Sequence, residues 1–378
     1  MTEQRKHEKY DALIYSCHAL APVRTAVAHP CDETSLVGAL DAAPAKIIKP
    51  ILVGPEAKVR ALAASLSLDL AVLQLVITPH SHAAAEKAVE IVRAGEADAL
   101  MKGSLHTDEL MTEVVRKDTG LRTERRISHV FIMDVPTYPK PIFITDAAVN
   151  IFPSLEDKAD IVRNAIDVAH SLGIAVPKVA ILSAVETITS KIPSTIDAAA
   201  LCRMADREQI TGALLDGPLA LDNAISREAA AIKHIRSPVA GDADILLVPD
   251  LEAGNMLAKE LSFLSDADAA GIVLGARVPI ILTSRADNVR TRMASCAVAA
   301  LYARARRVAV ADIGKLAGQA QCQSQHLYPV RSPGALNFRC WIFDCPRATV
   351  ERTHSLSTFR ARAPLVPSTS SGSLTHSE

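Results

Sequence analysis

The feature that most constrains the fold is an alternation, from about residue 22 to 307, of short apolar runs with longer amphipathic segments. Segment 83–93 is the clearest helix, because Gly95 follows it as a C-cap and another apolar run begins directly afterwards. Further helices are expected at 155–172 and 255–264, and strands at 25–27, 51–53, 99–101, 129–133, 142–145, 179–183, 245–248 and 280–283. This alternation predicts an α/β fold with a mostly parallel sheet.

Composition narrows the possible functions. Hydrophobic residues make up 49% of the 378 residues and aromatic residues only 3%, so the core must consist mainly of Ala, Val, Leu and Ile. The net charge of -1 argues against a surface for nucleic acid, and no apolar run approaches the roughly 20 residues of a membrane span. No targeting segment is expected. Seven cysteines without a CxxC pair predict reduced thiols in the cytoplasm and no metal site.

A first candidate site is the turn after the run 99–101, where Lys102, Gly103 and Ser104 precede a helical segment. Backbone amides at such a turn, beside a lysine, can bind phosphate, and Gly103 permits close approach of the backbone. Thr107 or Asp108 is expected to cap the helix that follows. Taken alone, the pattern also fits an ordinary strand-to-helix turn with a solvated lysine.

Three arginines, Arg122, Arg125 and Arg126, come just before the run 129–133. A guanidinium group matches phosphate oxygens bidentately, and a position at the mouth of a strand directs it towards a cleft. A solvated basic loop is an equally good interpretation of this segment by itself.

Two further segments place acidic and amide side chains directly after an apolar run. One contains Asn150, and the other contains Asp250, Glu252 and Asn255. Ligands of α/β folds collect beyond the carboxyl ends of strands, which makes the two asparagines candidates for binding. Two carboxylates without a third ligand make a weak metal site, so helix capping is the simpler interpretation of Asp250 and Glu252.

The last candidate segment brings Ser284, Arg285 and Asp287 to the end of the run 280–283. A hydroxyl beside a guanidinium group can stabilise negative charge on a carbonyl oxygen or a phosphate. No GxSxG motif surrounds Ser284 and the sequence places no histidine beside it, so a hydrolase nucleophile is not implied. The alternative is a capped helix start with Asp287 near the first turn.

Taken together, these segments resemble the phosphate acetyltransferase and phosphate butyryltransferase family from about residue 10 to 307. The likeness is greatest to the shorter, butyryl-type members and to the acyltransferase part of proteins labelled enoyl-CoA hydratase/phosphate acetyltransferase, although nothing here resembles a hydratase domain. The order and spacing of these segments together are far more specific for the family than any one segment alone. The strongest stretches are ADALMKGSLHTDEL, SHVFIMDV, FITDAAVNIFPSLEDKADIV, LLDGPLALDNAIS, GDADILLVPDLEAGNMLAKEL and IILTSRAD.

The resemblance implies two α/β domains of the isocitrate/isopropylmalate dehydrogenase-like type, with an active cleft between them, in a homodimer. We expect residues 10–145 and 285–318 to form domain I and residues 146–284 to form an inserted domain II. The implied reaction converts acyl-CoA and phosphate to acyl phosphate and coenzyme A, with acetyl or butyryl groups. Coenzyme A is then a substrate and no cofactor is expected.

In acetyl-type members of this family, a Ser-Arg pair after a core strand stabilises the reacting carbonyl, and an aspartate slightly further on deprotonates the thiol. The pair corresponds to Ser284 and Arg285. The later positions hold Arg290 and Thr291, so Asp287 is the nearest carboxylate, at a different offset. Direct transfer in a ternary complex is expected, because Ser284 lacks an evident base. The residues expected to bind phosphate or coenzyme A are Lys102, Gly103, Ser104, Arg125, Arg126, Asn150 and Asn255.

Residues 319–378 differ from the rest of the chain, because they contain six arginines, no lysine and many Ser, Thr and Pro residues. We expect a poorly ordered tail outside the catalytic unit. This tail motivates one alternative function, a catalytically weak acyl-CoA or acyl-phosphate binding protein. Another is a metal- and NAD-dependent dehydrogenase of related fold, which would need a cluster of aspartates that is not evident in the sequence.

Overall fold

A computed structural model of the protein describes residues 7–283 and 287–324, with side chains described as far as residue 308. The chain divides into two compact units, Met1–Cys322 and Gln323–Glu378, and the sheet belongs to the first. Its eleven strands lie in the order β3 (Gln74–Ile77), β2 (Ile48–Gly54), β1 (Val23–Ala28), β4 (Ala99–Lys102), β11 (Ile280–Ile281), β10 (Asp268–Leu274), β5 (Ser128–Asp134), β6 (Ile142–Thr145), β9 (Ile245–Leu247), β7 (Lys178–Leu182) and β8 (Leu214–Leu219).

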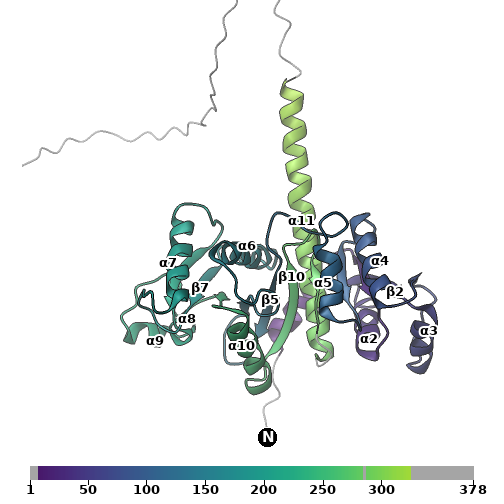
Figure 1. Cartoon of the computed structure of the whole chain (residues 1–378), viewed down its shortest axis with the longest axis horizontal. Coiled ribbons are helices and arrows are strands. Elements are labelled where there is room, and N and C mark those ends of the chain that lie inside the picture. The colour runs from purple at the N-terminus through teal and green to yellow at the C-terminus, as the bar shows by residue number, and fades with distance from the viewer. Residues whose placement is uncertain (1–6, 284–286, 325–378) are drawn as a thin grey trace, which may run out of the picture. The chain divides into compact units, whose positions relative to one another are not determined.

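Helices connect and cover these strands, and α4 packs on β1 and β2 whereas α6 and α10 pack on β5 and β6. Figure 1 shows β5 and β10 between the helices α2–α5 and the helices α6–α9. The bounds of the helices are α1 (Glu8–Cys17), α2 (Glu33–Ala42), α3 (Glu56–Ser65), α4 (Ser81–Arg93), α5 (Thr107–Val115), α6 (Leu155–Ser171), α7 (Pro193–Asp206), α8 (Leu221–Ile225), α9 (Arg227–Ile232), α10 (Leu251–Leu264) and α11 (Val289–Ser324).

The predicted α/β fold with a mostly parallel sheet is confirmed, because seven of the ten strand pairings are parallel. The three antiparallel pairings all involve β10 or β5, in the middle of the sheet. As a result β1, β2, β3, β4 and β11 run in one direction, and β6, β7, β8 and β9 run in the opposite direction. The carboxyl ends of β4 and β6 therefore lie at opposite edges of the sheet.

Most of the predicted elements are found within one to three residues of the expected bounds, and β6 matches its prediction at both ends. Gly95 has φ +76° directly after α4, as its predicted role as a C-cap requires. Asp250 caps α10, accepting a hydrogen bond of 2.9 Å from the amide of Ala253, which confirms the capping interpretation. However, α10 begins at Leu251, four residues before the predicted start.

The prediction that Thr107 or Asp108 caps α5 was wrong. The helix begins at Thr107 itself, and the preceding residue, His106, makes no capping hydrogen bond through its side chain. Three strands were also missed. β3 and β8 are the two edge strands, and β8 contains Pro218, which an edge strand tolerates because one side of it needs no ladder hydrogen bonds. The third, β10, carries Asp268 and Gly271 inside an otherwise apolar strand.

The buried core is aliphatic, as composition predicted, and Phe143 is the largest of its fully buried side chains. α11 continues to Ser324, so the first six residues of the predicted tail are helical, in keeping with the three glutamines among them. Residues 325–378, the remainder of that tail, lie outside the described residues. Among the helices that the structure describes, none is sufficiently long and apolar to span a membrane.

Candidate active site

A cavity of about 760 Å³ brings together three segments that are far apart in the sequence. α5 forms one side, the arginine segment before β5 forms the second, and the loop after β6 forms the third. Its lining residues are Thr107, Asp108, Met111, Thr112, Val115, Arg122, Arg125, Arg126, Ile127, Ala148, Val149 and Asn150. The volume is within the usual range for small-molecule sites. Arg125, Arg126 and Asn150, three of the predicted binding residues, are therefore brought together here.

The arginines of this cavity differ in their partners. Arg125 donates from Nη1 to the Asp167 carboxylate at 2.6 Å. Arg126 donates from Nε to Oδ1 of Asn150 at 2.7 Å and lies 3.5 Å from the Asp157 carboxylate. Arg122 is exposed and has no hydrogen bond or ion pair through its side chain among the described residues. Its guanidinium is thus the one in this cavity that needs no rearrangement to bind an anion.

The loop after β6 is organised by the carboxylate of Asp146, which is 3% exposed. Oδ1 accepts from the amides of Ala148 and Val149 at 2.9 and 3.1 Å, and Oδ2 accepts from the amide and side chain of Asn150 at 3.1 and 2.5 Å. Burial raises the pKa of this carboxyl, while the hydrogen bonds from Ala148 and Asn150 act in the opposite direction. The loop is therefore rigidly held where it meets the cavity.

The side chain of Asn150 also donates to the carbonyl of Ile127 at 2.9 Å, so it joins the loop to the start of β5. Asn255 lies on α10 and donates to the carbonyl of Ala147 at 3.1 Å. Gly254 beside it lets α10 approach, because a Cβ there would lie 2.9 Å from the carbonyl oxygen of Asp146. Asn255 thus supports the loop from behind and does not line the cavity.

The turn at Lys102, Gly103 and Ser104 leads into α5 but does not line the cavity. The amides of Gly103 and Ser104 donate to the carbonyls of Ala28 and His29, both at 2.9 Å. These two amides are therefore occupied by β1 and its extension, and a phosphate at this turn would have to use other donors. Lys102 is 9% exposed and its Nζ donates to the carbonyl of Leu105 at 3.2 Å.

His29 is a neighbour of this turn that the sequence did not single out. Its Nδ1 lies 3.1 Å from Oγ of Ser104, which donates in turn to the His29 carbonyl at 2.9 Å. Burial lowers the pKa of His29, and the charge of Lys58 acts in the same direction. A neutral imidazole is therefore favoured beside Ser104. The only available signal in the sequence was the position of His29 at the end of a predicted strand.

Ser284 and Arg285 lie outside the described residues. Asp287 is described, and its carbonyl oxygen accepts a hydrogen bond from Arg292. Asn288 caps α11, accepting from the amide of Thr291 at 2.8 Å. α11 begins at Val289, so the structure agrees with the alternative of a capped helix start near Asp287.

Sequence reasoning also missed the acidic side chains of α6 that hold the arginines, namely Asp157, Asp160 and Asp167. It missed the cavity face of α5 as well. The spacing of the three carboxylates along an amphipathic helix was visible, but the segment that they face was not. Among the described residues, no group of three or more His, Cys, Asp or Glu side chains is arranged to hold a metal ion.

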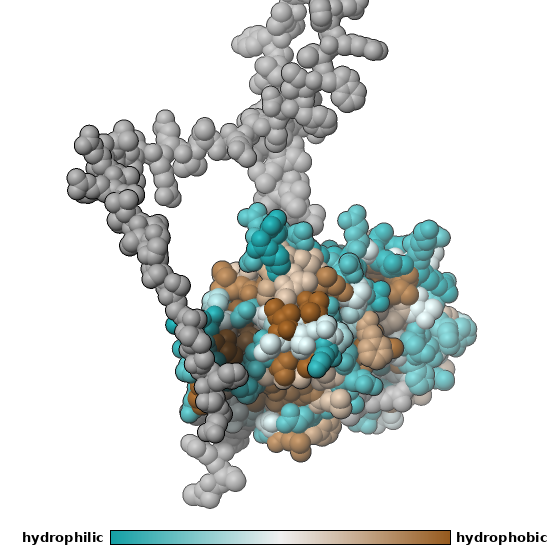
Figure 2. Space-filling model, turned by 60° about the vertical axis from the view of Figure 1, so that its left-hand side comes forward, coloured by the Kyte–Doolittle hydropathy of each residue, from teal (hydrophilic) through white to brown (hydrophobic). Residues whose placement is uncertain are grey.

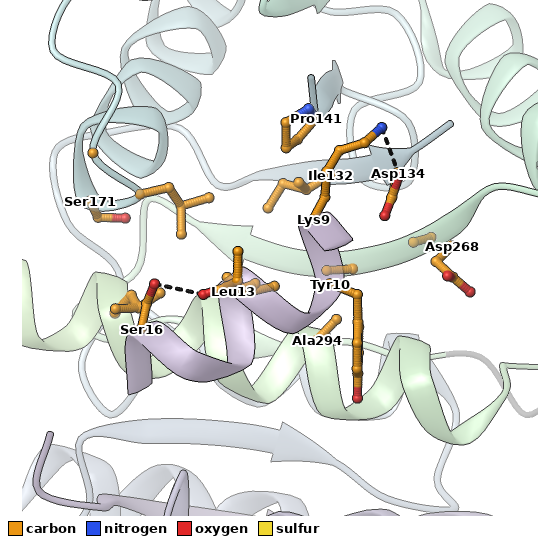
Figure 3. A pocket seen from close by; sticks show the side chains of 16 residues that line it. Lys9, Tyr10, Leu13, Ser16, Ile132, Asp134, Pro141, Ser171, Asp268 and Ala294 are labelled. Carbon is orange, nitrogen blue, oxygen red and sulfur yellow. Dashed lines mark hydrogen bonds and ion pairs between the residues drawn. The ribbon is translucent and has the colours of Figure 1, made fainter. Parts of the chain in front are cut away.

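A second cavity, of about 500 Å³, lies beneath α1 and against β5 and β10. Figure 3 shows Lys9 of α1 reaching towards Asp134 of β5, whereas the side chain of Tyr10 points away from Ile132 and Asp134, past Ala294. Lys9 is paired with Asp134 at 2.8 Å and also donates to two backbone carbonyls. None of the predicted binding residues lines this second cavity.

Comparison with known proteins places the chain in a family. Residues 80–300 match the family described as Phosphate acetyl/butaryl transferase. The chain is 68% identical over 301 residues to a phosphate acetyltransferase of Rhizobium meliloti, covering 80% of this chain and 95% of the relative. It is 42% identical over 296 residues to a phosphate butyryltransferase of Clostridium acetobutylicum, covering 78% and 98%.

A solved structure agrees with this assignment. The branched-chain phosphotransacylase of Enterococcus faecalis is 31% identical, with a TM-score of 0.65, over 74% of this chain and 99% of that one. The family match includes α5, the arginine segment and the loop after β6, and so the whole of the larger cavity. The chain therefore belongs to the phosphate acetyl/butaryl transferase family, and it is an acyltransferase.

Proposed function

We propose that the protein transfers an acyl group between the sulfur of coenzyme A and inorganic phosphate, with the arginine-lined cavity as part of its active site. The observation that carries this proposal is the unpaired guanidinium of Arg122 beside Arg125 and Arg126 in a cavity with an apolar side. Acyl phosphates and coenzyme A are both anionic, and arginine binds phosphate oxygens bidentately. Relatives named phosphate acetyltransferase and phosphate butyryltransferase support this function.

The reaction requires one acyl transfer and no redox change. In the direction of acyl-CoA formation, the thiol loses its proton and the thiolate attacks the carbonyl carbon of the acyl phosphate. The new C–S bond forms, the C–O bond to phosphate breaks, and the released phosphate finally carries the proton. A free thiol has a pKa of ~8.5, so positive charge nearby promotes formation of the thiolate. Coenzyme A is a substrate in this scheme, and no further cofactor is proposed.

We also propose a role for each of the candidate residues. Arg122 binds a phosphate group, whereas Arg125, Arg126 and Asn150 shape the wall on which that group rests. Asn255 supports this wall through the loop after β6. Lys102, Gly103 and Ser104 set the start of α5, and Lys102 adds positive charge behind it. We retain the proposal that Ser284 and Arg285 stabilise the oxyanion and that Asp287, the carboxylate nearest to this pair in the sequence, is the candidate base for the thiol.

The first experiment measures thioester formation from acetyl, propionyl and butyryl phosphate with coenzyme A. Arg122→Ala should lower kcat/KM for acyl phosphate by roughly 10- to 100-fold, the usual effect of losing hydrogen bonds to a charged group. Arg60→Ala on α3 is the matched control, because Arg60 is an exposed arginine in a surface pair with Glu56 and lies outside the cavity. The absence of turnover with every acyl phosphate, in the folded wild-type protein, would refute the proposed function.

We also propose direct transfer in a ternary complex. A covalent acyl-enzyme would exchange labelled phosphate into acyl phosphate without coenzyme A, because the phosphate leaves before the thiol reacts. Direct transfer predicts no such exchange until coenzyme A is added. Rapid exchange in its absence would contradict this part of the proposal.

The two-domain division is likewise a proposal, with residues 10–145 and 285–318 in domain I, residues 146–284 in domain II, and an isocitrate/isopropylmalate dehydrogenase-like cleft between them. The reversal of strand direction in the middle of the sheet supports a division into two halves, because each half then resembles a separate parallel sheet. It differs from these bounds in that β6 pairs with β9 of the second half and β11 pairs with β4 of the first. A cytoplasmic location is proposed on the basis of the free thiols of Cys17, Cys31, Cys202 and Cys296.

A homodimer is proposed on the basis of exposed apolar side chains around α10. Met256, Phe263 and Leu264 are 64%, 79% and 81% exposed, and Phe152 in the preceding loop is 79% exposed. The amide of Leu251 donates to the carbonyl of Ile151, so this loop adjoins the start of α10. Figure 2 shows apolar areas among hydrophilic ones on one face of the molecule. Phe263→Glu should convert a dimer to a monomer in sedimentation analysis, because it places a charge in the interface.

A further inference from the structure

The lining of the arginine-lined cavity combines side chains of two kinds. Arg122, Arg125, Arg126 and Asn150 form a polar wall. In the same lining, Met111, Val115, Ile127 and Val149 present apolar side chains, which we name the apolar wall. A ligand that fills both must combine anionic groups with a hydrocarbon segment.

The contribution of α5 to this wall follows from helical geometry. Thr107, Met111 and Val115 are spaced by four residues, so they share one face of the helix. Leu110 and Val114 lie on the neighbouring face and are 0% exposed in the core. Met111 and Val115 are thus the apolar side chains of α5 that line the cavity.

The other half of the apolar wall is held more firmly. Val149 lies in the loop whose amides are bound by Asp146, and Ile127 is 8% exposed at the start of β5. Met111 and Val149 are partly buried and pack against one hydrophobic cluster, to which Ile127 also belongs. Val149 is therefore fixed by its backbone, whereas the unbranched Met111 side chain can adopt several rotamers and adjust to what it contacts.

We propose that the apolar wall binds the hydrocarbon chain of the transferred acyl group, and that Met111 and Val149 determine the longest chain accepted. This inference rests on the proposed function, because it assumes that the phosphate of an acyl phosphate lies against the arginines. An acetyl group presents a single methyl to the wall, whereas a butyryl group presents two further methylenes. On this proposal, the wild-type enzyme should accept straight-chain acyl groups of four carbons as well as acetyl.

The competing occupant is the pantetheine arm of coenzyme A, which is also partly apolar. The two are distinguishable because the arm is identical in every reaction, whatever the acyl group. A residue that contacts the arm changes the rate with all acyl phosphates by the same factor. A residue that contacts the acyl chain changes the ratio of rates between chain lengths.

The test compares kcat/KM between acyl phosphates of different chain length, measured with coenzyme A for three variants. For Met111→Phe and Val149→Leu the measured quantity is the ratio of kcat/KM for butyryl phosphate to kcat/KM for acetyl phosphate. Met111→Phe reduces the space for the chain, and the ratio should fall by roughly 15-fold, the contribution of two methylenes. Met111→Ala enlarges the space and should raise turnover of hexanoyl phosphate relative to butyryl phosphate.

Val149→Leu should lower the ratio of butyryl to acetyl turnover, as Met111→Phe does. It provides a second test if Met111→Phe does not fold. Met256→Phe is the control, because Met256 is 64% exposed on α10 and outside the cavity.

Because each ratio is measured within a single protein, partial loss of folded enzyme does not alter it. An unchanged ratio in the folded Met111 and Val149 variants would overturn the inference, and a uniform loss with all chain lengths would assign the apolar wall to the pantetheine arm. Failure of the proposed function is a separate result, since it requires that the wild-type enzyme turn over no acyl phosphate at all.

Discussion

Gly38 of α2 and Arg292 of α11 fit together because residue 38 has no side chain. A Cβ there would lie 2.8 Å from Cδ of Arg292 and 3.0 Å from its Nε. Arg292 is 7% exposed and donates to the carbonyl oxygen of Asp287. This packing holds the residue that directly follows the segment containing Ser284 and Arg285.

Gly38→Ala should lower the free energy of unfolding by about 1–3 kcal/mol, since the added methyl must displace a buried side chain. In an Arg292→Ala background the clash disappears, and the same substitution should stabilise α2, because alanine favours a helix over glycine by up to ~1 kcal/mol. Denaturant unfolding of the four proteins in this double-mutant cycle measures the coupling. Equal effects of Gly38→Ala in both backgrounds would contradict the contact.

Gly103→Ala should be among the most disruptive single substitutions in the chain. A Cβ at this position would lie 2.3 Å from the carbonyl oxygen of Ala28 and 2.5 Å from that of His29. Backbone atoms of a buried strand cannot move aside as a side chain can, so we expect a loss of at least about 3 kcal/mol in stability. Gly95→Ala is the control, because its Cβ would meet nothing within 4 Å and only its φ of +76° carries a cost, about 1 kcal/mol. Thermal unfolding distinguishes the two variants.

Asp146→Ala should abolish the order of the loop after β6. The substitution leaves the amides of Ala148, Val149 and Asn150 without their acceptors, at a cost of roughly 1–3 kcal/mol for each buried group. Stability and acyl transfer should therefore fall together. Asp146→Asn keeps one acceptor oxygen and should lose less of both, as measured by chemical unfolding and by the thioester assay. An Asp146→Ala protein of wild-type stability would disprove this role.

His129 makes the protein sensitive to acid. Burial lowers the pKa of this histidine from 6.5 to about 3, and its Nδ1 has no hydrogen-bond partner among the described residues. Below pH 6.5 the unfolded chain binds a proton that the folded protein does not, so stability falls as pH decreases, by up to about 1.4 kcal/mol for each pH unit. His129→Phe should remove this contribution between pH 5 and 6.5. The slope is measured by following unfolding across that range, and an unchanged slope in His129→Phe would contradict this prediction.

Much of the fold could be predicted because its signals are local. The periodicity of segment 83–93, the glycine after it and the capping carboxylate of Asp250 each act over a few residues, and each was correct. The strands that were missed depend on their neighbours. β10 has a glycine at position 271 because a side chain there would crowd the His129 ring and the Leu282 carbonyl. These two groups become neighbours of Gly271 only in the folded sheet.

The sequence by itself determined the fold class, the family resemblance and the residue types that bind phosphate, because these follow from short-range patterns and the order of segments. Only the tertiary structure decided which arginine is unpaired and which residues face it. Arg125 and Arg126 are bound by carboxylates or amides 24 to 42 residues away, while Arg122 is left available. The physical reason is that a hydrogen bond depends on a separation of about 3 Å, and the reversal of the sheet at β5 and β10 sets such separations between segments that no local pattern connects.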